Sequence, residues 1–315
     1  MISSNQTNFT DTNSTKTEAY FSITIIIQLC LSIQITLSNV LIVIIILFLI
    51  KKKTFSNIIF LLISLVDLFV GLVSIPGNVL LSLDRAHWPL PKILCIIYKT
   101  FDYSSSNLSL ILLVIIIVHR YKLLKDPHTH KEDMSKTKWI VAAFVLTFYY
   151  TIWFIIWCLY FHIQEARSVC YFSFNVYIYI FYICVTVVPF LFMIIINMRM
   201  IRLFVVLKRK KKQTRVESSH RKQDKAIYCI LSITLNLILC WSSFMFLWPI
   251  AKVCATCFPK AFDYLFQVSN MLIYLFSGIN PIILLYFNRN FRQVLMRKLF
   301  KQRQTRESFY ASRTY

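Results

Sequence analysis

Long apolar runs separated by short polar and basic segments dominate the pattern of this chain. Seven such runs occur, at about residues 21–50, 57–83, 95–119, 139–161, 174–207, 226–251 and 262–287. As a helix, each run could cross the roughly 30 Å apolar core of a bilayer. Backbone polar groups in lipid must be hydrogen-bonded internally, which a helix achieves within one segment. The pattern therefore predicts an all-α membrane protein, with a seven-transmembrane helix bundle over residues 21–287.

The composition supports a membrane protein and argues against an enzyme. Hydrophobic residues make up 57% of the 315 positions and charged residues only 15%, whereas soluble domains carry roughly a quarter charged residues. The chain has 3 glycines and no G-x-G-x-x-G or Walker pattern, so a glycine-rich phosphate loop is not expected. No nucleophile paired with a base and no set of metal ligands shares a predicted helix face. We therefore expect no enzymatic activity.

The basic residues predict how the bundle is oriented. Of the 35 lysines and arginines, 28 fall in four segments that a seven-span chain places on one side, residues 51–53, 120–138, 199–225 and 289–313. Because basic loops stay in the cytoplasm, we expect the N-terminus outside the cell and the C-terminus inside. The net charge of +22 then reflects this bias and an attraction to anionic lipid. The basic runs lack interleaved aromatic residues, so nucleic acid is not an expected partner.

The N-terminal residues independently predict an extracellular start. Asn5, Asn8 and Asn13 each begin an N-x-S/T glycosylation acceptor. They lie in a polar stretch whose composition is typical of disordered segments. We expect residues 1–20 to form a glycosylated extracellular tail of a multi-pass protein in the plasma membrane.

The C-terminal residues predict a helix that lies on the membrane rather than across it. Residues 288–303 place apolar side chains on one helical face and basic side chains elsewhere. This pattern is typical of an amphipathic helix on the inner leaflet. Residues 304–315 are then expected to be a cytoplasmic tail.

Four cysteines are predicted on the outer side of the membrane, where conditions are oxidising. Cys95 opens the third span and Cys170 precedes the fifth, whereas Cys254 and Cys257 share the motif "CATC" in the third outer loop. Two outer pairs in an oxidising compartment favour two disulfide bonds. The alternative, a zinc site at "CATC", would need two further ligands, for which Cys95 and Cys170 are the nearest candidates.

Two acidic residues, Asp67 and Asp102, lie deep within predicted spans. A carboxylate at the membrane centre costs roughly 2.5–3.5 kcal/mol on insertion scales, so each is a candidate functional residue. Asp102 follows Cys95 by seven residues, which places it about 10 Å below the outer surface on a helix. A carboxylate at that depth suits capture of a cation from outside. The alternative is a structural acid paired with Lys99, three residues earlier.

A series of short motifs runs in register through the predicted spans. They are "SNVLIV" with Asn39, "LISLVDLFVGLVSIP" with Asp67, "HWPLPKILC" with Trp88 and Cys95, "HRY" with Arg120, Pro189, "CWSSF" with Trp241, and "YLFSGINPII" with Tyr274, Asn280 and Pro281. From about residue 30 to residue 300 the chain resembles the class A, rhodopsin-like G-protein-coupled receptors, and within them the biogenic-amine branch. Three segments resemble different members: "KDPHTHKEDMSK" trace-amine receptors, "INMRMI" histamine receptors and "KVCATCFPKAFDYL" muscarinic receptors.

The resemblance implies a ligand site at the outer half of the bundle. It assigns Asp102 as the counter-ion of a protonated amine, a pairing that aromatic faces strengthen. The ligand-binding residues it implies are Asp102, Tyr103, Ser106, Phe181, Trp241, Phe244 and Tyr274. Phe181 and Val185 stand where catechol-binding receptors carry serines, so we expect a small monoamine or a quaternary amine rather than a catecholamine.

A sodium site near mid-membrane is also implied by the resemblance. Asp67, Ser109 and Asn280 would supply the oxygen ligands that a hard cation prefers, beside Asn39. Phe276 occupies one position that is usually polar. The alternative is a protonated Asp67 hydrogen-bonded to Asn280 without any ion. No other metal and no cofactor is expected.

The inner end of the third span is predicted to contact a heterotrimeric G protein. The motif "HRY" consists of His119, Arg120 and Tyr121. In the family, the arginine at the position of Arg120 is restrained by an acid that precedes it, but here His119 replaces that acid. Because histidine is neutral or weakly basic near neutral pH, this restraint is missing. The other departures from the family pattern are Phe144, Asn197, Ser243 and Leu284.

These departures keep two alternatives open. One is an orphan or decoy receptor of the same fold, with weakened or ligand-independent coupling. The other is a secondary transporter, which would show repeated halves and glycine- or proline-broken spans. The chain has no internal symmetry and few glycines, so the main hypothesis is an amine receptor.

Overall fold

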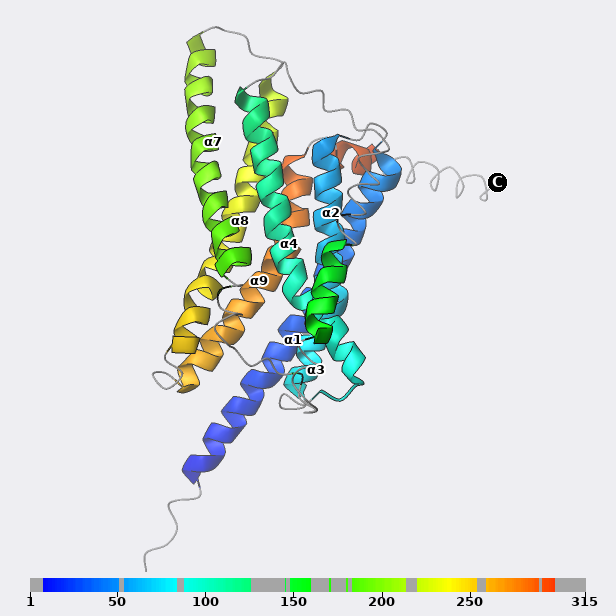
Figure 1. The fold of residues 1–315 in the computed structure, drawn as a ribbon, viewed down its shortest axis with the longest axis vertical. Coiled ribbons are helices and arrows are strands. Elements are labelled where there is room, and N and C mark those ends of the chain that lie inside the picture. The colour runs from blue at the N-terminus through cyan, green and yellow to red at the C-terminus, as the bar shows by residue number, and fades with distance from the viewer. Residues whose placement is uncertain are drawn as a thin grey trace, which may run out of the picture.

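The computed structural model describes residues 8–50, 54–83, 88–125, 145, 148–159, 170, 180, 183–213, 220–253, 259–288 and 291–297. Within these ranges every element is a helix, and Figure 1 shows the helices side by side in an elongated bundle. In chain order the elements are α1 (Asn8–Ile44), η1 (Ile45–Leu49), α2 (Phe55–Phe69), η2 (Val70–Ser74), α3 (Ile75–Leu83), α4 (Lys92–Lys125), η3 (Ile183–Val187), α7 (Val188–Gln213), α8 (His220–Val253) and α9 (Pro259–Phe287). Further helical segments lie at Phe148–Leu159 and at 291–297.

The apolar runs of the sequence coincide with membrane-spanning helices. In the described ranges, six stretches are long and apolar enough to cross a bilayer: Ser22–Leu49, Phe55–Leu83, Lys92–Lys125, Ile183–Arg209, Lys225–Leu247 and Gln267–Phe287. The shorter apolar helix Phe148–Leu159 falls inside the predicted fourth span. Large apolar side chains such as Phe48 (77% exposed) and Leu37 (66% exposed) face outward, as expected of a lipid-facing surface. The predicted all-α fold class is confirmed.

Helix α1 extends further toward the N-terminus than the sequence pattern indicated. The composition before residue 21 is typical of a disordered segment, yet the backbone is helical from Asn8. Adding residues to an existing helix gains one hydrogen bond per residue without a new nucleation cost. The apolar span therefore lets the helix continue into the polar residues that precede it.

Two of the π-helical turns come just before a proline. Element η2 ends at Ser74, two residues before Pro76, and η3 ends at Val187, two residues before Pro189. Proline has no N–H and its ring clashes with the carbonyl four residues back. A π-helical turn widens the helix locally and is a recognised cause of helix bending. We infer that these turns accommodate the prolines and set the direction in which the second and fifth spans continue.

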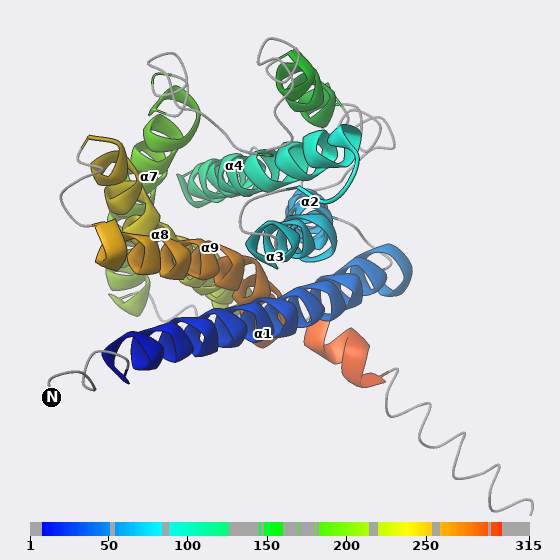
Figure 2. The same cartoon turned by 90° about the horizontal axis from the view of Figure 1, so that it is seen from below.

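Helix α4 is the central element of the bundle. It contacts α2, α3, α7 and α8, whereas α1 lies against α2, α3 and α9 at one edge of the bundle (Figure 2). Leu110, Leu113, Ile116 and Ile117 of α4 are fully buried in the main hydrophobic cluster. Residues at both ends of α4 are therefore held on a helix whose position many neighbours fix.

The outer ends of α3 and α4 approach each other closely at Gly77. A Cβ atom added there would overlap the ring of Tyr98, which is itself buried. Small residues allow membrane helices to pack at short distances. Glycine at position 77 is thus required for the outer end of α4 to lie against α3.

We expect Gly77→Ala to destabilise the protein, because either the Tyr98 ring or the helix backbone must shift. Overpacking of this kind costs about 1–3 kcal/mol, which should lower the midpoint of thermal unfolding in detergent. In a Tyr98→Leu background the same substitution should cost much less, because the overlapping ring is absent. Equal losses in both backgrounds would show that the contact does not constrain the helices.

Candidate functional site

Asp102 lies on the outer half of α4 and is hydrogen-bonded to a neighbouring span. The hydroxyl of Tyr274, from α9, donates to Oδ1 of Asp102 at 3.2 Å. In turn, Nδ2 of Asn78, from the second span, donates to the Tyr274 hydroxyl at 3.1 Å. Asp102 is half-buried, whereas Tyr274 is almost fully buried. Three spans therefore hold one carboxylate in a fixed orientation.

Aromatic side chains surround this part of α4. The Trp88 ring stacks on Tyr98 with 5.4 Å between centroids, and the Tyr103 ring lies 5.2 Å from that of Trp157. They belong to an outer hydrophobic cluster that also contains Cys95 and Cys170. This cluster lies against the outer half of α4, the part of the helix that carries Asp102.

The Cys95–Cys170 disulfide predicted from the sequence is confirmed. The bond joins the start of α4 to the second outer loop across a separation of 75 residues, with 6.0 Å between Cα atoms. It ties that loop to the helix that carries Asp102. Cys254 and Cys257 lie outside the described residues, so their pairing stays a prediction.

The structure brings some of the predicted ligand-binding residues together. Tyr274 contacts Asp102, Tyr103 is the next residue on α4, and Ser106 is half-buried one turn below. Trp241 is buried in the main hydrophobic cluster deeper in the bundle, and Phe244 is half-buried one turn away on α8. Phe181 lies outside the described residues.

Two side chains near Asp102 were not predicted from the sequence. Asn78 supports Tyr274, and Tyr98 is an electrostatic neighbour of the Asp102 carboxyl. Neither residue stands out in the sequence, because an asparagine or a tyrosine in an apolar run has no distinctive spacing. Their role depends on the rotation of α3 and α4, which the close approach at Gly77 sets.

Lys99 lies one turn above Asp102 but does not form a direct ion pair with it among the described contacts. The lysine is only 7% exposed, and its Nζ lies 4.8 Å from the Tyr98 ring centroid and 5.5 Å from that of Tyr103. The hydrogen bond to Asp102 comes instead from Tyr274. Lys99 and Asp102 therefore interact through their charges without a direct ion pair among the described contacts, and the alternative of a structural acid stays open.

A second carboxylate, Asp67 on α2, is fully buried near the middle of the bundle. Its Oδ1 accepts hydrogen bonds from Ser277 at 2.8 Å and from Ser109 at 3.4 Å, whereas Oδ2 has no hydrogen-bond partner in the described part of the chain. Ser277 was not predicted, because the family resemblance places the usual polar residue of this site at position 276, where this chain has Phe276. The adjacent serine supplies a hydroxyl instead.

Asn280 lies close to Asp67, but its own hydrogen bond goes elsewhere. Nδ2 of Asn236 donates to Oδ1 of Asn280 at 3.3 Å, and Nδ2 of Asn280 has no hydrogen-bond partner among the described residues. The Asn280 side chain nevertheless interacts with the Asp67 carboxyl, so an Asp67–Asn280 hydrogen bond without an ion stays an open alternative to the sodium site. Asn39 donates to the carbonyls of Ile35 at 3.0 Å and Ser277 at 3.3 Å rather than to Asp67.

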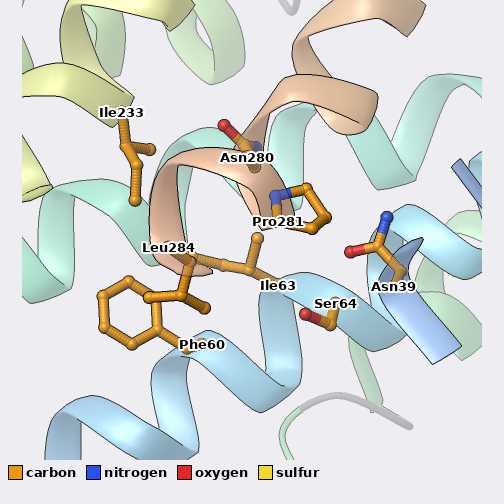
Figure 3. A pocket seen from close by; sticks show the side chains of 8 residues that line it. All are labelled: Asn39, Phe60, Ile63, Ser64, Ile233, Asn280, Pro281 and Leu284. Atoms are coloured by element: carbon orange, nitrogen blue, oxygen red, sulfur yellow. The ribbon is translucent and has the colours of Figure 1, made fainter. Parts of the chain in front are cut away.

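A small pocket lies between the first, second, sixth and seventh spans, on the inner side of Asn280 (Figure 3). Asn39, Ser64 and Asn280 form its polar wall, whereas the remaining walls are apolar. The apolar lining residues are Phe60, Ile63, Ile233, Pro281 and Leu284. Leu284 stands where the family resemblance places a tyrosine. Position 284 thus adds an apolar side chain to the wall of this pocket, where a tyrosine would add a hydroxyl.

Comparison with known proteins identifies the family. The sequence matches the family described as 7 transmembrane receptor (rhodopsin family) over residues 38–284. This chain belongs to the rhodopsin family of seven-transmembrane receptors. The family is one of receptors rather than enzymes, as expected from the sequence.

The receptor is similar to amine receptors of several animals. It is 27% identical to trace amine-associated receptor 365 of Petromyzon marinus over 276 residues, which are 83% of this chain and 75% of that protein. It is 30% identical to the histamine H1 receptor of Homo sapiens over 122 residues, or 38% of this chain and 24% of that protein. It is 31% identical to the histamine H1 receptor of Bos taurus over 105 residues, which are 32% of this chain and 21% of that protein. The match thus spans about a quarter or less of these histamine receptors. Together the relatives confirm the predicted resemblance to the amine branch.

At the inner end of α4, Arg120 of the receptor donates a hydrogen bond to a serine. Its Nη2 donates to Oγ of Ser56, on α2, at 2.5 Å. Ser56 is 2% exposed, and the ring of His119 lies 4.4 Å from that of Phe55. Tyr121 is half-buried against the main hydrophobic cluster. Sequence reasoning missed Ser56, because a serine at the start of a span has no distinctive signal.

Asn197 and Ser243, two departures from the family pattern, make local hydrogen bonds. The Thr234 hydroxyl donates to Oδ1 of Asn197 at 3.2 Å, which links α7 to α8. The Ser243 hydroxyl donates to the Cys240 carbonyl of its own helix at 3.5 Å. Both side chains are therefore accommodated within the bundle.

Proposed function

We propose that this receptor binds a small cationic amine from outside the cell and activates a heterotrimeric G protein. The observation that supports this proposal is the position of Asp102, which Tyr274 and Asn78 hold on the outer half of α4. A half-buried carboxylate close to aromatic side chains attracts a cation strongly, because water screens the charge poorly there. Aromatic faces add to that attraction.

The relatives supply independent support for an amine ligand. Their names refer to histamine and to trace amines, both of which are small amines with a protonated nitrogen at neutral pH. Val185 is half-buried near the outer cluster and offers no hydroxyl. We therefore propose a monoamine or a quaternary amine, rather than a catecholamine, as the ligand.

The same proposal implies one orientation of the receptor in the plasma membrane. Asp102 must face the outside, so Arg120 and the basic segments face the cytoplasm, in agreement with the distribution of lysine and arginine. Asn5, Asn8 and Asn13 then lie outside the cell, where glycosylation acceptors are used. Residues 288–303 lie at the inner leaflet, where the described helix 291–297 buries Phe291 completely.

Asp102→Asn should abolish high-affinity binding of cationic ligands. The substitution keeps the shape and a hydrogen-bonding group but removes the charge that pairs with the amine. Loss of one partner from a partly buried ion pair costs roughly 3–5 kcal/mol, or two to three decades in affinity. The measurement is competition binding on surface-expressed receptor, with surface amount determined by antibody.

Tyr274→Phe should have a smaller effect on affinity than Asp102→Asn. It removes only the hydroxyl that orients the carboxylate, so affinity should fall by about tenfold, as expected for one hydrogen bond to a charged group. If Asp102→Asn bound cationic ligands within threefold of the parent, the amine proposal would fail.

Coupling to a G protein is the second half of the proposal, and it depends on Arg120. Because residue 119 is a histidine, it provides no carboxylate to hold the guanidinium, and its ring lies against Phe55. The Ser56 hydroxyl accepts a hydrogen bond from that guanidinium. We propose that Ser56 restrains Arg120 in the resting receptor and that this weaker restraint permits some ligand-independent activity. The decoy alternative is that the receptor does not couple at all.

Ser56→Ala should raise ligand-independent nucleotide exchange on the G protein. A hydrogen bond to a charged group contributes about 1.5–3 kcal/mol, so its loss should increase exchange by roughly tenfold or more. Ser38→Ala is the control, because among the described residues the Ser38 hydroxyl bonds only the Ile35 carbonyl of its own helix. Exchange at the G protein's intrinsic rate in parent and variant alike would favour the decoy alternative.

We also propose that Asp67 binds a sodium ion. Asp67 Oδ1 is near the hydroxyl groups of Ser277 and Ser109, and Oδ2 has no hydrogen-bond partner among the described residues. Ser74, on the same span, likewise buries a hydroxyl oxygen without such a partner. A buried carboxylate surrounded by oxygen atoms matches the ligands that a hard cation prefers. A bound cation would also neutralise a charge that is otherwise costly at this depth.

Sodium should therefore raise the thermal stability of the receptor, and potassium at equal ionic strength should not. A ligand present at 100 times its dissociation constant stabilises a protein by about 2.7 kcal/mol. Asp67→Asn should remove this sodium-specific stabilisation, and Ser277→Ala should weaken it. A sodium effect of unchanged size in Asp67→Asn would exclude this residue as the ligand.

A further inference from the structure

Lys99 places a second charge beside the proposed amine site. The side chain is 7% exposed and lies one helical turn above Asp102, toward the outer surface. Its Nζ lies over the faces of Tyr98 and Tyr103, at 4.8 Å and 5.5 Å from their ring centroids. No described residue accepts a hydrogen bond from this ammonium. Two aromatic faces attract a cation but provide no acceptor for its three N–H donors.

The charge of Lys99 changes what the site as a whole attracts. Among the described residues, Lys99 is the only charged group that acts on Asp102, and Asp102 is the only one that acts on Lys99. The two side chains together carry no net charge. A ligand with a single positive charge would gain attraction from Asp102 and suffer repulsion from Lys99. Burial strengthens both interactions, because screening by water is weak there.

A ligand that carries both charges would satisfy both side chains. Its ammonium would pair with Asp102, whose carboxylate Tyr274 orients. Its anionic group would accept hydrogen bonds from the Lys99 ammonium, which otherwise has no acceptor among the described residues. Buried charges are stable only when they are paired and hydrogen-bonded. The vertical order also fits entry from outside, because the ammonium would lie deeper and the anionic group nearer the surface.

We propose that the receptor recognises a zwitterion, an amine that also carries a carboxylate or another anionic group. Lys99 is then the residue that selects carboxylated amines over plain amines. This inference depends on the proposed amine site, because Asp102 must bind the ammonium. It adds a requirement for the ligand that Asp102 alone does not impose.

Matched pairs of small molecules test the selectivity directly. Tyrosine with tyramine, histidine with histamine, and phenylalanine with 2-phenylethylamine each differ by one carboxylate. Binding is measured on purified full-length receptor in lipid nanodiscs. The readout is the concentration of each compound that gives half of its maximal shift in the midpoint of thermal unfolding. We expect at least one carboxylated member to bind tenfold or more tightly than its plain amine.

Three variants locate the source of this selectivity. Lys99→Met should remove the preference and let plain amines bind more tightly than in the parent, because the repelling cation is gone. Lys99→Arg should retain the preference, since the positive charge remains. Lys92→Met is the matched control: it removes an exposed lysine from the outer end of the same helix and should leave the preference unchanged.

The outcomes separate this inference from the proposed function. If no carboxylated amine binds, or if the preference survives in Lys99→Met, the zwitterion inference is overturned. Plain amines that bind through Asp102 in the same experiment would leave the amine proposal standing. Tight binding of carboxylated ligands that Asp102→Asn does not weaken would overturn the amine proposal and this inference together.

Discussion

Polar side chains inside a bilayer must be paired within the protein, and this constraint organises the receptor. Lipid offers no hydrogen-bond partners, so an unpaired polar group in a span is costly. Several deep polar side chains are paired across helices. The pairs are Asp102 with Tyr274, Asp67 with Ser277 and Ser109, Asn107 with Thr186, Asn197 with Thr234, and Asn236 with Asn280. Each pair fixes the rotation of one span relative to another.

Helix α4 collects three of these links and connects the two ends of the receptor. Asp102 near its outer end and Arg120 near its inner end are eighteen residues apart, or about 27 Å of helix. One face of the segment between them is buried in the main hydrophobic cluster. Closely packed cores transmit displacement rather than absorbing it. A ligand that repositions the outer end of α4 therefore has a direct mechanical path to the contact between Arg120 and Ser56.

The sequence was sufficient to predict the spans, because their hydropathy depends only on local composition. It was also sufficient to single out Asp102 and the Cys95–Cys170 pair, since a carboxylate in an apolar run and outer cysteines are rare. It could not identify Asn78, Ser56 or Ser277. These side chains are common in membrane helices, and their contacts depend on helix rotation. The π-helical turns before Pro76 and Pro189 alter that rotation, and no hydropathy pattern reveals them.

The central claim is that a cation bound at Asp102 activates a G protein. Nucleotide exchange on purified G proteins of each class, with the receptor in nanodiscs, tests this claim most directly. The ligands are amines, plain and carboxylated, each compared with the neutral alcohol of the same shape. We expect at least one amine to raise exchange well above the ligand-free rate, and its alcohol counterpart not to do so. Equal stimulation by amine and alcohol, or no stimulation by any amine, would contradict it.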